Sequence, residues 1–491
     1  MKHISDIKKY SRCARAYWLS KNTNKDFFPY IYYNENIIEL TKEYLNIKKY
    51  FNGNKGDNTE LALNAINNEV QWLVNPRFDY HNLRIKIGIM EKRKFGYNIY
   101  FLFNNTHPKE SEATSIADHI WVLKHLGIKI EEIKLIHLSS DYIRIGELEI
   151  DKLLKVSDYF YTDKNVKGNK VSKIVKKKYR DLDPILLAMD EVLENGTLIA
   201  HRSNICTRRN KCDYFEDCFP NGEKDTSILN LVQSSNKFNM YEEGIDDMRN
   251  VNLDLIEGTR HQYAQIMAAK NNELFFDKYV MKNWINNKII YPISYLDFEW
   301  ETYAYPPFDM MKPMDVLVFQ YSLHIEDKEF GNVIHKQYLG KKDCRIDFIE
   351  HLLNDLPTTG SIMVFNADGG EKLRLKQLAI QFPEYKNKLK AVWERMVDLS
   401  IPFSSGNIYD NRMQGMFSLK KLVNIVSNFN YETLDISHGM EAVRAWRLLD
   451  HLTLEESKKI EEELFEYCAM DTKSMIIVFH WILDRLQANN L

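Results

Sequence analysis

The stretch Tyr295-Leu296-Asp297-Phe298-Glu299 holds two acidic residues separated by one position. It follows Pro292 and is rich in residues that favour β-strands, so it predicts a short buried strand. Side chains alternate between the faces of a strand, and Asp297 and Glu299 therefore point the same way. Two adjacent carboxylates repel each other and resist burial unless a cation joins them. Such an all-oxygen site suits Mg²⁺ or Mn²⁺, although an exposed acidic strand end has the same pattern.

Near the end of the chain, a long helix is predicted from about Leu454. Thr453 and Glu456 have the spacing of a capping box at its start. The apolar stripe of this helix passes through Asp471, which is therefore expected to face inward. A carboxylate in that position needs a partner, and a metal ion is one candidate. Tyr467 lies one turn earlier on the same face, which gives the pattern Tyr-x3-Asp.

A further acidic position follows the predicted strand Ser361 to Phe365. Asn366 and Asp368 come directly after this strand, and Glu371 begins a predicted helix. An acid entering a helix at this point would lie at the same edge of the sheet as the two earlier carboxylates. The residues alone leave open whether Asp368 or Glu371 is the acid that binds metal.

Cysteines form a different candidate site in the first part of the chain. Cys206, Cys212 and Cys218 are spaced with five residues between neighbours, and Cys13 is the remaining cysteine of this half. The spacing is not the paired Cys-x2-Cys of a zinc finger. Four thiolates suit an iron–sulfur cluster or zinc, while unligated cysteines in a reducing cell are the alternative.

The elements that must position these residues suggest an α/β protein of more than one domain. A chain of 491 residues is too long for one ordinary core. Strands are predicted at Leu83 to Met90 and Tyr97 to Phe103, and a first helix at Ser5 to Leu19. We expect one unit at residues 1–225, a mostly helical connector at 226–289, and a second α/β unit with a central sheet at 290–491.

Composition and charge narrow the class of protein. The chain is 44% hydrophobic and 27% charged, as a soluble globular protein should be. No signal peptide and no apolar run long enough to span a bilayer are apparent, so we expect a cytoplasmic protein without a membrane partner. The net charge of -3 gives no global signal for nucleic acid, and any such surface must be a local patch.

One local patch is the basic stretch from Lys164 to Arg180, which contains eight lysine or arginine residues. Tyr159, Phe160, Tyr161 and Tyr179 stand nearby and could stack on bases while the cations hold phosphates. A solvated charged face explains the same run of residues.

The order of the three acidic stretches resembles that of the DEDD exonucleases, in the Tyr branch that includes RNase D. The second unit also resembles the C-terminal domain of an uncharacterised bacterial family. In that family a RecB-like nuclease domain precedes a DEDD-type, RNase H-like domain. The stretches that carry this resemblance are Tyr295–Glu299, Glu371–Leu375, Met396–Leu399, Phe417–Lys421 and Tyr467–Asp471.

This resemblance implies 3′→5′ removal of nucleotides by an RNase H-like domain with two divalent ions, Mg²⁺ or Mn²⁺. Tyr467 would orient the attacking water, and Asp398 would support the ligands. Glu371 is favoured over Asp368 because the Lys-x-Arg-Leu that follows keeps the register of the family, although its distance from Asn366 is one residue longer. The implied metal ligands are Asp297, Glu299, Glu371 and Asp471. The residues implied to contact phosphates are Ser418, Lys420 and Lys421.

The first unit resembles the RecB-like, CRISPR-associated nuclease type. The matching parts are Ser11-Arg12-Cys13 with Trp18-Leu19, the three late cysteines, and residues 137–142. In that type the four cysteines hold a [4Fe–4S] cluster, which the resemblance therefore implies for Cys13, Cys206, Cys212 and Cys218.

The metal-binding acids of that nuclease type are missing from this sequence. The Asp position falls near Gly88, the Glu-x-Lys position falls near Tyr100-Phe101-Leu102, and the Gln position falls at about Asp118. Apolar residues cannot hold a metal, so we expect that this nuclease motif is lost and that the first unit binds nucleic acid and supports the cluster.

Three functions follow as expectations. The first is a metal-dependent 3′→5′ exonuclease that acts on single-stranded DNA, and the second is the same reaction on RNA. The third is a non-catalytic nucleic-acid-binding subunit of a repair or defence complex. The retained acids of the second unit argue against the third, because a site without activity tends to lose them.

Overall fold

The computed structural model describes residues 1–23, 37–196, 200, 202–207, 211–219, 224–429, 431, 435–436 and 438–488. The chain has a mixed α/β architecture, as the sequence predicts. Its contacts divide it into two units, and each unit is described separately below. Unit 1 comprises Met1–His201 with Thr302–Asp315, and unit 2 comprises Arg202–Glu301 with Val316–Leu491. The late cysteines and residues 226–289 therefore pack within unit 2.

Unit 1 is built on a six-stranded sheet in the order β2-β3-β6-β7-β8-β9. Strands β7 and β8 are parallel, and helix α5 (Ala113–His125) connects them. Trp121 on α5 is fully buried in the main core of the unit. The strands are β2 (Phe51–Asn52), β3 (Trp72–Val74), β6 (Ile89–Lys92), β7 (Tyr97–Phe103), β8 (Ile130–Leu138) and β9 (Leu154–Ser157).

Two of the predicted elements of unit 1 are divided. The strand expected at Leu83 to Met90 is two strands, because β5 (Leu83–Lys86) pairs with β1 and β4 while β6 joins the large sheet. The helix expected at Ser5 to Leu19 is split at Cys13 into α1 (Ile4–Arg12) and α2 (Ala14–Asn22). Cys13 is extended, with φ -164° and ψ 114°, and its Sγ accepts a hydrogen bond from the Ala16 N–H at 3.5 Å. The cysteine thus caps the second helix.

The other elements of unit 1 surround these sheets. They are β1 (Lys2–His3), α3 (Ile37–Tyr44), α4 (Thr59–Asn67), β4 (Arg77–Tyr80), α6 (Ile150–Leu153), β10 (Tyr159–Tyr161), β11 (Lys167–Lys170), α7 (Val171–Lys178) and α8 (Asp183–Asn195).

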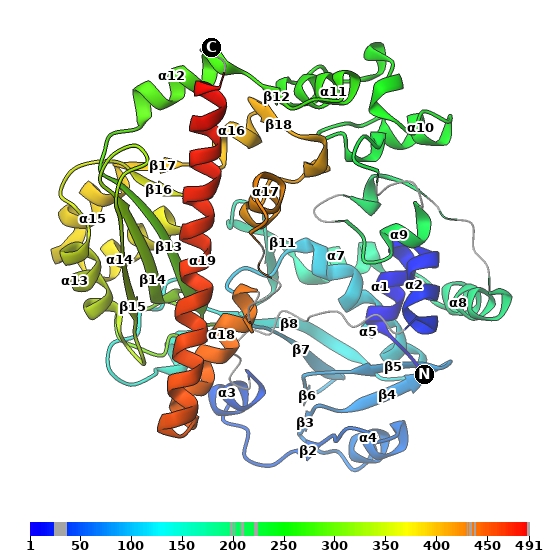
Figure 1. The fold of residues 1–491 in the computed structure, drawn as a ribbon. Helices are drawn as coiled ribbons and strands as arrows, with labels where there is room; N and C mark the ends of the chain where they lie inside the picture. Colours follow the sequence, from blue (N-terminus) through cyan, green and yellow to red (C-terminus); the bar gives the residue numbers. More distant parts are fainter. Residues whose placement is uncertain are drawn as a thin grey trace. The chain divides into compact units, whose positions relative to one another are not determined.

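Unit 2 is built on a five-stranded sheet in the order β15-β14-β13-β16-β17. Strands β14 and β15 are antiparallel, whereas β16 runs parallel to both β13 and β17. Helices α13 (Arg345–Asp355), α14 (Glu371–Gln381) and α15 (Lys386–Trp393) cover one face, and α19 (Leu454–Gln487) lies along the other (Figure 1). The strands are β13 (Ile293–Thr302), β14 (Val316–Glu326), β15 (Val333–Leu339), β16 (Ile362–Val364) and β17 (Met396–Asp398).

Helix α19 begins as predicted. The Thr453 Oγ1 accepts the Glu456 N–H at 3.4 Å, and the Glu456 carboxylate accepts the Thr453 N–H at 2.9 Å. Its apolar side chains, among them Leu464, Met475 and Phe479, are fully buried, and this burial fastens the helix to the sheet. None of the helices in the described parts of the chain has the length and apolar character needed to cross a lipid bilayer.

Residues 226–289 of unit 2 are mostly helical, as expected, and together with the described residues from 202 onward they surround a core of their own that includes Phe215, Phe219 and Phe238. The main elements here are α9 (Phe215–Cys218), α10 (Lys237–Glu242), α11 (Arg260–Asn271), β12 (Phe275–Phe276) and α12 (Lys278–Lys288). Strand β12 pairs with β18 (Ile408–Tyr409), so this region packs against the second half of the unit.

Candidate metal centre

Three carboxylates from strand β13 and helix α19 meet in unit 2. One oxygen from each of Asp297, Glu299 and Asp471 lies within 4.8 Å of the other two. Asp297 and Glu299 share a face of β13 as predicted, whereas Phe298 between them is buried on the opposite face against Phe348. All three acids are partly buried in the fold.

The topology of the sheet explains where the acids stand. The parallel pairing of β13 with β16 reaches Tyr295, and Asp297 lies two residues further on. The acids are therefore beyond the carboxyl end of β16, where the chain leaves the sheet toward Glu371. Ligand sites of α/β sheets commonly lie at this edge.

The electrostatics of the cluster favour a bound cation. Burial, followed by the charge of Asp471, raises the pKa of Asp297 and of Glu299 well above the usual values. Burial also raises the pKa of Asp471 to about 6, although a hydrogen bond from Tyr431 opposes this shift. Three carboxylates in this arrangement either share protons or bind positive charge.

Glu371 is a fourth acid near this cluster. It begins α14, is only 3% exposed, and its Oε2 has no hydrogen-bond partner among the described residues. Burial raises its pKa to about 8, and the charge of Asp471 contributes to this shift. Its charge also raises the pKa of Asp297. A buried carboxylate oxygen without a partner is costly, and a cation would satisfy it.

Asp368, the alternative middle acid, has different surroundings. Its side chain is 85% exposed and forms an ion pair with Lys372 at 3.0 Å. No carboxylate of the cluster contributes to its pKa, which the Lys372 ammonium holds below the usual value. These surroundings favour Glu371 as the acid of the centre.

Asp398 fixes the loop that leads to Glu371. Its carboxylate accepts hydrogen bonds from the backbone N–H groups of Asn366 at 2.9 Å, Ala367 at 3.0 Å and Ser400 at 2.8 Å. Asn366 adopts the left-handed conformation, with φ 69°, which asparagine tolerates better than most residues. These hydrogen bonds hold the segment between β16 and α14 in place.

Tyr467 and Lys420 stand beside the acids. The Lys420 Nζ lies 3.4 Å from the Tyr467 Oη and sits over the rings of both Tyr467 and Tyr431. The Lys420 charge opposes the rise in the pKa of Glu299 and Asp471 and therefore partly balances the cluster. Burial raises the pKa of Tyr467 far above its usual value, so its phenol stays protonated and acts through hydrogen bonds alone.

Ser418 and Lys421, the two other residues predicted to contact phosphate, form hydrogen bonds with residues close in sequence. Ser418 caps α17 (Leu419–Val426), and its Oγ accepts the Lys421 N–H at 3.4 Å. The Lys421 Nζ lies 3.3 Å from the Gln414 Oε1. Of the three residues, Lys420 is the one whose side chain reaches the acidic cluster.

Two residues of the centre have no signal in the sequence pattern. The Tyr431 hydroxyl donates to the Asp471 Oδ1 at 2.7 Å and also contacts the Ser474 Oγ at 2.8 Å. Gly439 begins α18 (Gly439–Leu448), and a side chain there would approach the Glu299 Oε2 at 3.7 Å and the Tyr467 Oη at 3.9 Å. Neither residue belongs to a periodic or acidic motif, so only the three-dimensional structure reveals them.

Tyr431→Phe is expected to weaken Mn²⁺ binding about 10-fold, because partners that orient a metal ligand typically contribute this much to affinity. Without the phenol, Asp471 loses the hydrogen bond that fixes one oxygen. Titration calorimetry of the metal-free protein measures the change. The matched control is Tyr279→Phe, whose ring is 90% exposed. Equal Mn²⁺ affinity in both variants would contradict this role.

The stability of the metal-free protein is expected to fall as pH rises from about 5 to 8. Asp471 and Glu371 have folded pKa values of about 6 and about 8, above those of the unfolded chain. The folded state therefore holds protons that the unfolded state releases, and it loses stability as those protons leave. Mn²⁺ should restore melting temperature by on the order of 5 °C at pH 8 and by less at pH 5. Differential scanning fluorimetry across this range tests the expectation, and an Mn²⁺ effect independent of pH would oppose it.

The cysteines predicted as cluster ligands lie in both units. Cys206, Cys212 and Cys218 pack at the margin of one core cluster in unit 2, and the Cys212 N–H donates to the Cys206 carbonyl at 2.7 Å. Arg202 stacks over Phe219, with its guanidinium carbon 5.3 Å from the ring centre. Cys13 belongs to unit 1, where it caps α2. Three of the four thiols thus share one region.

In unit 1, residues at the positions of the nuclease motif form contacts within the fold. The Tyr100 hydroxyl on β7 donates to the buried Glu91 carboxylate at 2.8 Å. Asp118 is buried on α5 and pairs with Arg180 at 3.2 Å. Across the described residues of this unit, no three potential metal ligands come as close together as those around Asp297.

Comparisons with known proteins cover part of the chain that forms the metal centre. Residues 294–418 match a domain family described as "Domain of unknown function (DUF2779)". The chain is also 26% identical over 228 residues to the uncharacterized protein MG366 of Mycoplasma genitalium, and the match covers 42% of this chain and 34% of that relative. The chain thus spans about a third of the length of this curated relative. No solved structure matches the chain. The matched domain contains Asp297, Glu299 and Glu371, and it ends before Tyr467 and Asp471.

Proposed function

We propose that this protein is a metal-dependent 3′→5′ exonuclease that hydrolyses nucleic-acid phosphodiesters in the cytoplasm, with single-stranded DNA as its favoured substrate. The observation that carries this proposal is the convergence of Asp297, Glu299 and Asp471 at one edge of the sheet, with Glu371 buried nearby. A group of acids that cannot all ionise without a cation is the donor set that two Mg²⁺ or Mn²⁺ ions require.

In this proposal the residues of the chain have separate tasks. Bound divalent ions would supply Lewis acidity for phosphodiester hydrolysis. Asp297, Glu299, Glu371 and Asp471 would hold these ions. The protonated Tyr467 hydroxyl orients the attacking water, and the Lys420 ammonium stabilises a phosphate of the substrate strand. Asp398 and Tyr431 keep the ligand-bearing segments in place through the hydrogen bonds described above.

The same proposal assigns a fold to each of the two units. Unit 2 would be an RNase H-like DEDD domain, which is supported by its Asp-x-Glu on a central strand and its Tyr-x3-Asp on the last helix. Unit 1 would be a RecB-like domain without its own nuclease centre. The ion pair of Asp118 with Arg180 and the satisfied carboxylate of Glu91 support a structural use of these acids.

The test uses single-stranded DNA and RNA labelled at either end. With 5′-label and Mn²⁺, the proposal expects a ladder of progressively shorter products, and with 3′-label it expects early release of a labelled mononucleotide. DNA should be degraded faster than RNA. Faster degradation of RNA would identify RNA as the preferred substrate and overturn the choice of DNA. Absence of cleavage on both polymers with either metal, with binding retained, would favour a non-catalytic nucleic-acid-binding subunit.

We also propose that Cys13, Cys206, Cys212 and Cys218 hold a [4Fe–4S] cluster, because three of these thiols gather at one core margin. Protein purified without air should be brown and contain iron and sulfide, and Cys212→Ala should lose most of both. Cys344→Ala, at a buried cysteine directly before helix α13 of unit 2, is the control and should keep the iron. Colourless protein with stoichiometric zinc would replace the cluster by a zinc site.

A further inference from the structure

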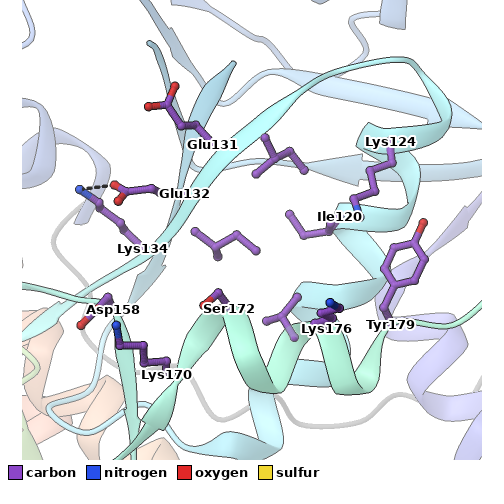
Figure 2. A pocket seen from close by; sticks show the side chains of 13 residues that line it. Ile120, Lys124, Glu131, Glu132, Lys134, Asp158, Lys170, Ser172, Lys176 and Tyr179 are labelled. Atoms are coloured by element: carbon purple, nitrogen blue, oxygen red, sulfur yellow. Dashed lines mark ion pairs between the residues drawn. The ribbon is translucent and has the colours of Figure 1, made fainter. Parts of the chain in front are cut away.

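Unit 1 contains a recess that the proposed exonuclease reaction does not use. Its volume is about 710 Å³, and it lies between α5, strand β8 and helix α7 (Figure 2). The floor is apolar, with Ile120 and Val175 buried and Ile133 partly buried. A recess of this size with an apolar floor is typical of a ligand site.

The rim of the recess carries lysines. Lys124, Lys170 and Lys176 are exposed and surround the opening, and the Lys124 Nζ lies 4.6 Å from the centre of the Tyr179 ring (Figure 2). Tyr179 is itself 36% exposed. The rim thus offers ammonium groups next to an accessible aromatic face.

The acids of the recess do not cancel this charge. The Glu132 carboxylate pairs with Lys134 at 2.9 Å, and the Glu131 carboxylate accepts the Phe95 N–H at 3.0 Å. Glu131 keeps its charge, because a backbone N–H is neutral, so Glu131 and Asp158 stand against three rim lysines. The same helix, α7, carries Lys173, Lys177 and Lys178 on its exposed surface. The surroundings of the recess therefore attract a ligand with several negative charges.

We propose that this recess is a second binding site for single-stranded nucleic acid, separate from the acidic centre. A base would lie on the apolar floor beside Tyr179, and consecutive phosphates would contact Lys124, Lys170 and Lys176. The combination of an apolar floor, an accessible aromatic ring and three rim lysines favours a nucleic acid over an acidic peptide, because carboxylate side chains would leave the floor unfilled. The inference does not depend on the exonuclease reaction.

Fluorescence anisotropy of the full-length protein with labelled oligo(dT) of about 20 nucleotides tests this site. EDTA keeps the strand intact and leaves the acidic centre without metal, where its carboxylates repel phosphate. The site variants are Lys170→Ala/Lys176→Ala and Tyr179→Leu. The matched control is Lys8→Ala/Lys55→Ala, which removes two exposed lysines of the same unit outside the recess.

The expected result is a loss of affinity of about 10-fold in each site variant and less than about 2-fold in the control. The double lysine variant should also reduce the slope of log K against log salt by about 1.4, since each lost contact to a single strand contributes about 0.7. Tyr179→Leu should leave this slope unchanged. Equal losses in site and control variants would overturn the proposal, as would equal competition by poly-glutamate and by unlabelled oligo(dT). Neither outcome bears on cleavage, so failure of this site and failure of the exonuclease remain distinguishable.

Discussion

Asp297→Asn is expected to lower the proposed nuclease activity by about 10³-fold or more, since in the proposed reaction this carboxylate would hold a metal ion and contribute several kcal/mol of transition-state stabilisation. The same substitution should raise the melting temperature of the metal-free protein. Asparagine keeps the shape of the side chain but removes one charge from a cluster in which the carboxylates raise the pKa of one another. Mn²⁺, which is expected to stabilise the parent protein, should add little to the variant.

A fall in activity together with a rise in melting temperature distinguishes a metal centre from a cluster of acids with only a structural role. A variant that simply misfolds would lose both quantities. Asp484→Asn, at an exposed acid of helix α19, is the matched control and should change neither by more than the experimental scatter. Activity measured with single-stranded DNA and melting measured with and without EDTA complete the comparison. Full activity in Asp297→Asn would remove this carboxylate from the reaction.

Those parts of the centre that lie on regular elements follow from periodicity. The two-residue repeat of a strand places Asp297 and Glu299 together, and the 3.6-residue repeat of α19 places Tyr467 and Asp471 on its inward face. The strand Tyr97–Phe103 has the bounds that its composition predicts. In each case one local pattern decides the orientation of the side chain.

The remaining parts depend on contacts between distant segments. Tyr431 reaches Asp471 from a segment without a periodic pattern, and its partner is 40 residues away. Cys13 divides a continuous helical pattern because its own backbone is extended and its thiol caps the next helix. At Gly88 the chain passes from the small sheet to the large one, and a side chain there would meet Leu102 at 2.9 Å. Such features are set by tertiary neighbours that a local pattern does not contain.

Glu371→Gln is expected to lower nuclease activity at least about 100-fold, whereas Asp368→Asn should change it less than about 2-fold. The two acids are three residues apart, and the structure separates them. Glu371 is 3% exposed and has an oxygen without a hydrogen-bond partner among the described residues. Asp368 projects outward and pairs with Lys372. An exposed ion pair of this kind contributes little to stability, so its loss should be nearly silent.

The pair of variants also provides its own control for folding, because both substitutions lie on the same short segment before and at the start of α14. Mn²⁺ titration should show weaker binding in Glu371→Gln and parental binding in Asp368→Asn. Removing the Glu371 charge should further reduce the fall in metal-free stability between pH 5 and 8, since this group carries the folded pKa of about 8. A large loss of activity in Asp368→Asn with a silent Glu371→Gln would reverse the assignment, because it would mean that the loop turns its exposed acid toward the metal when substrate is bound.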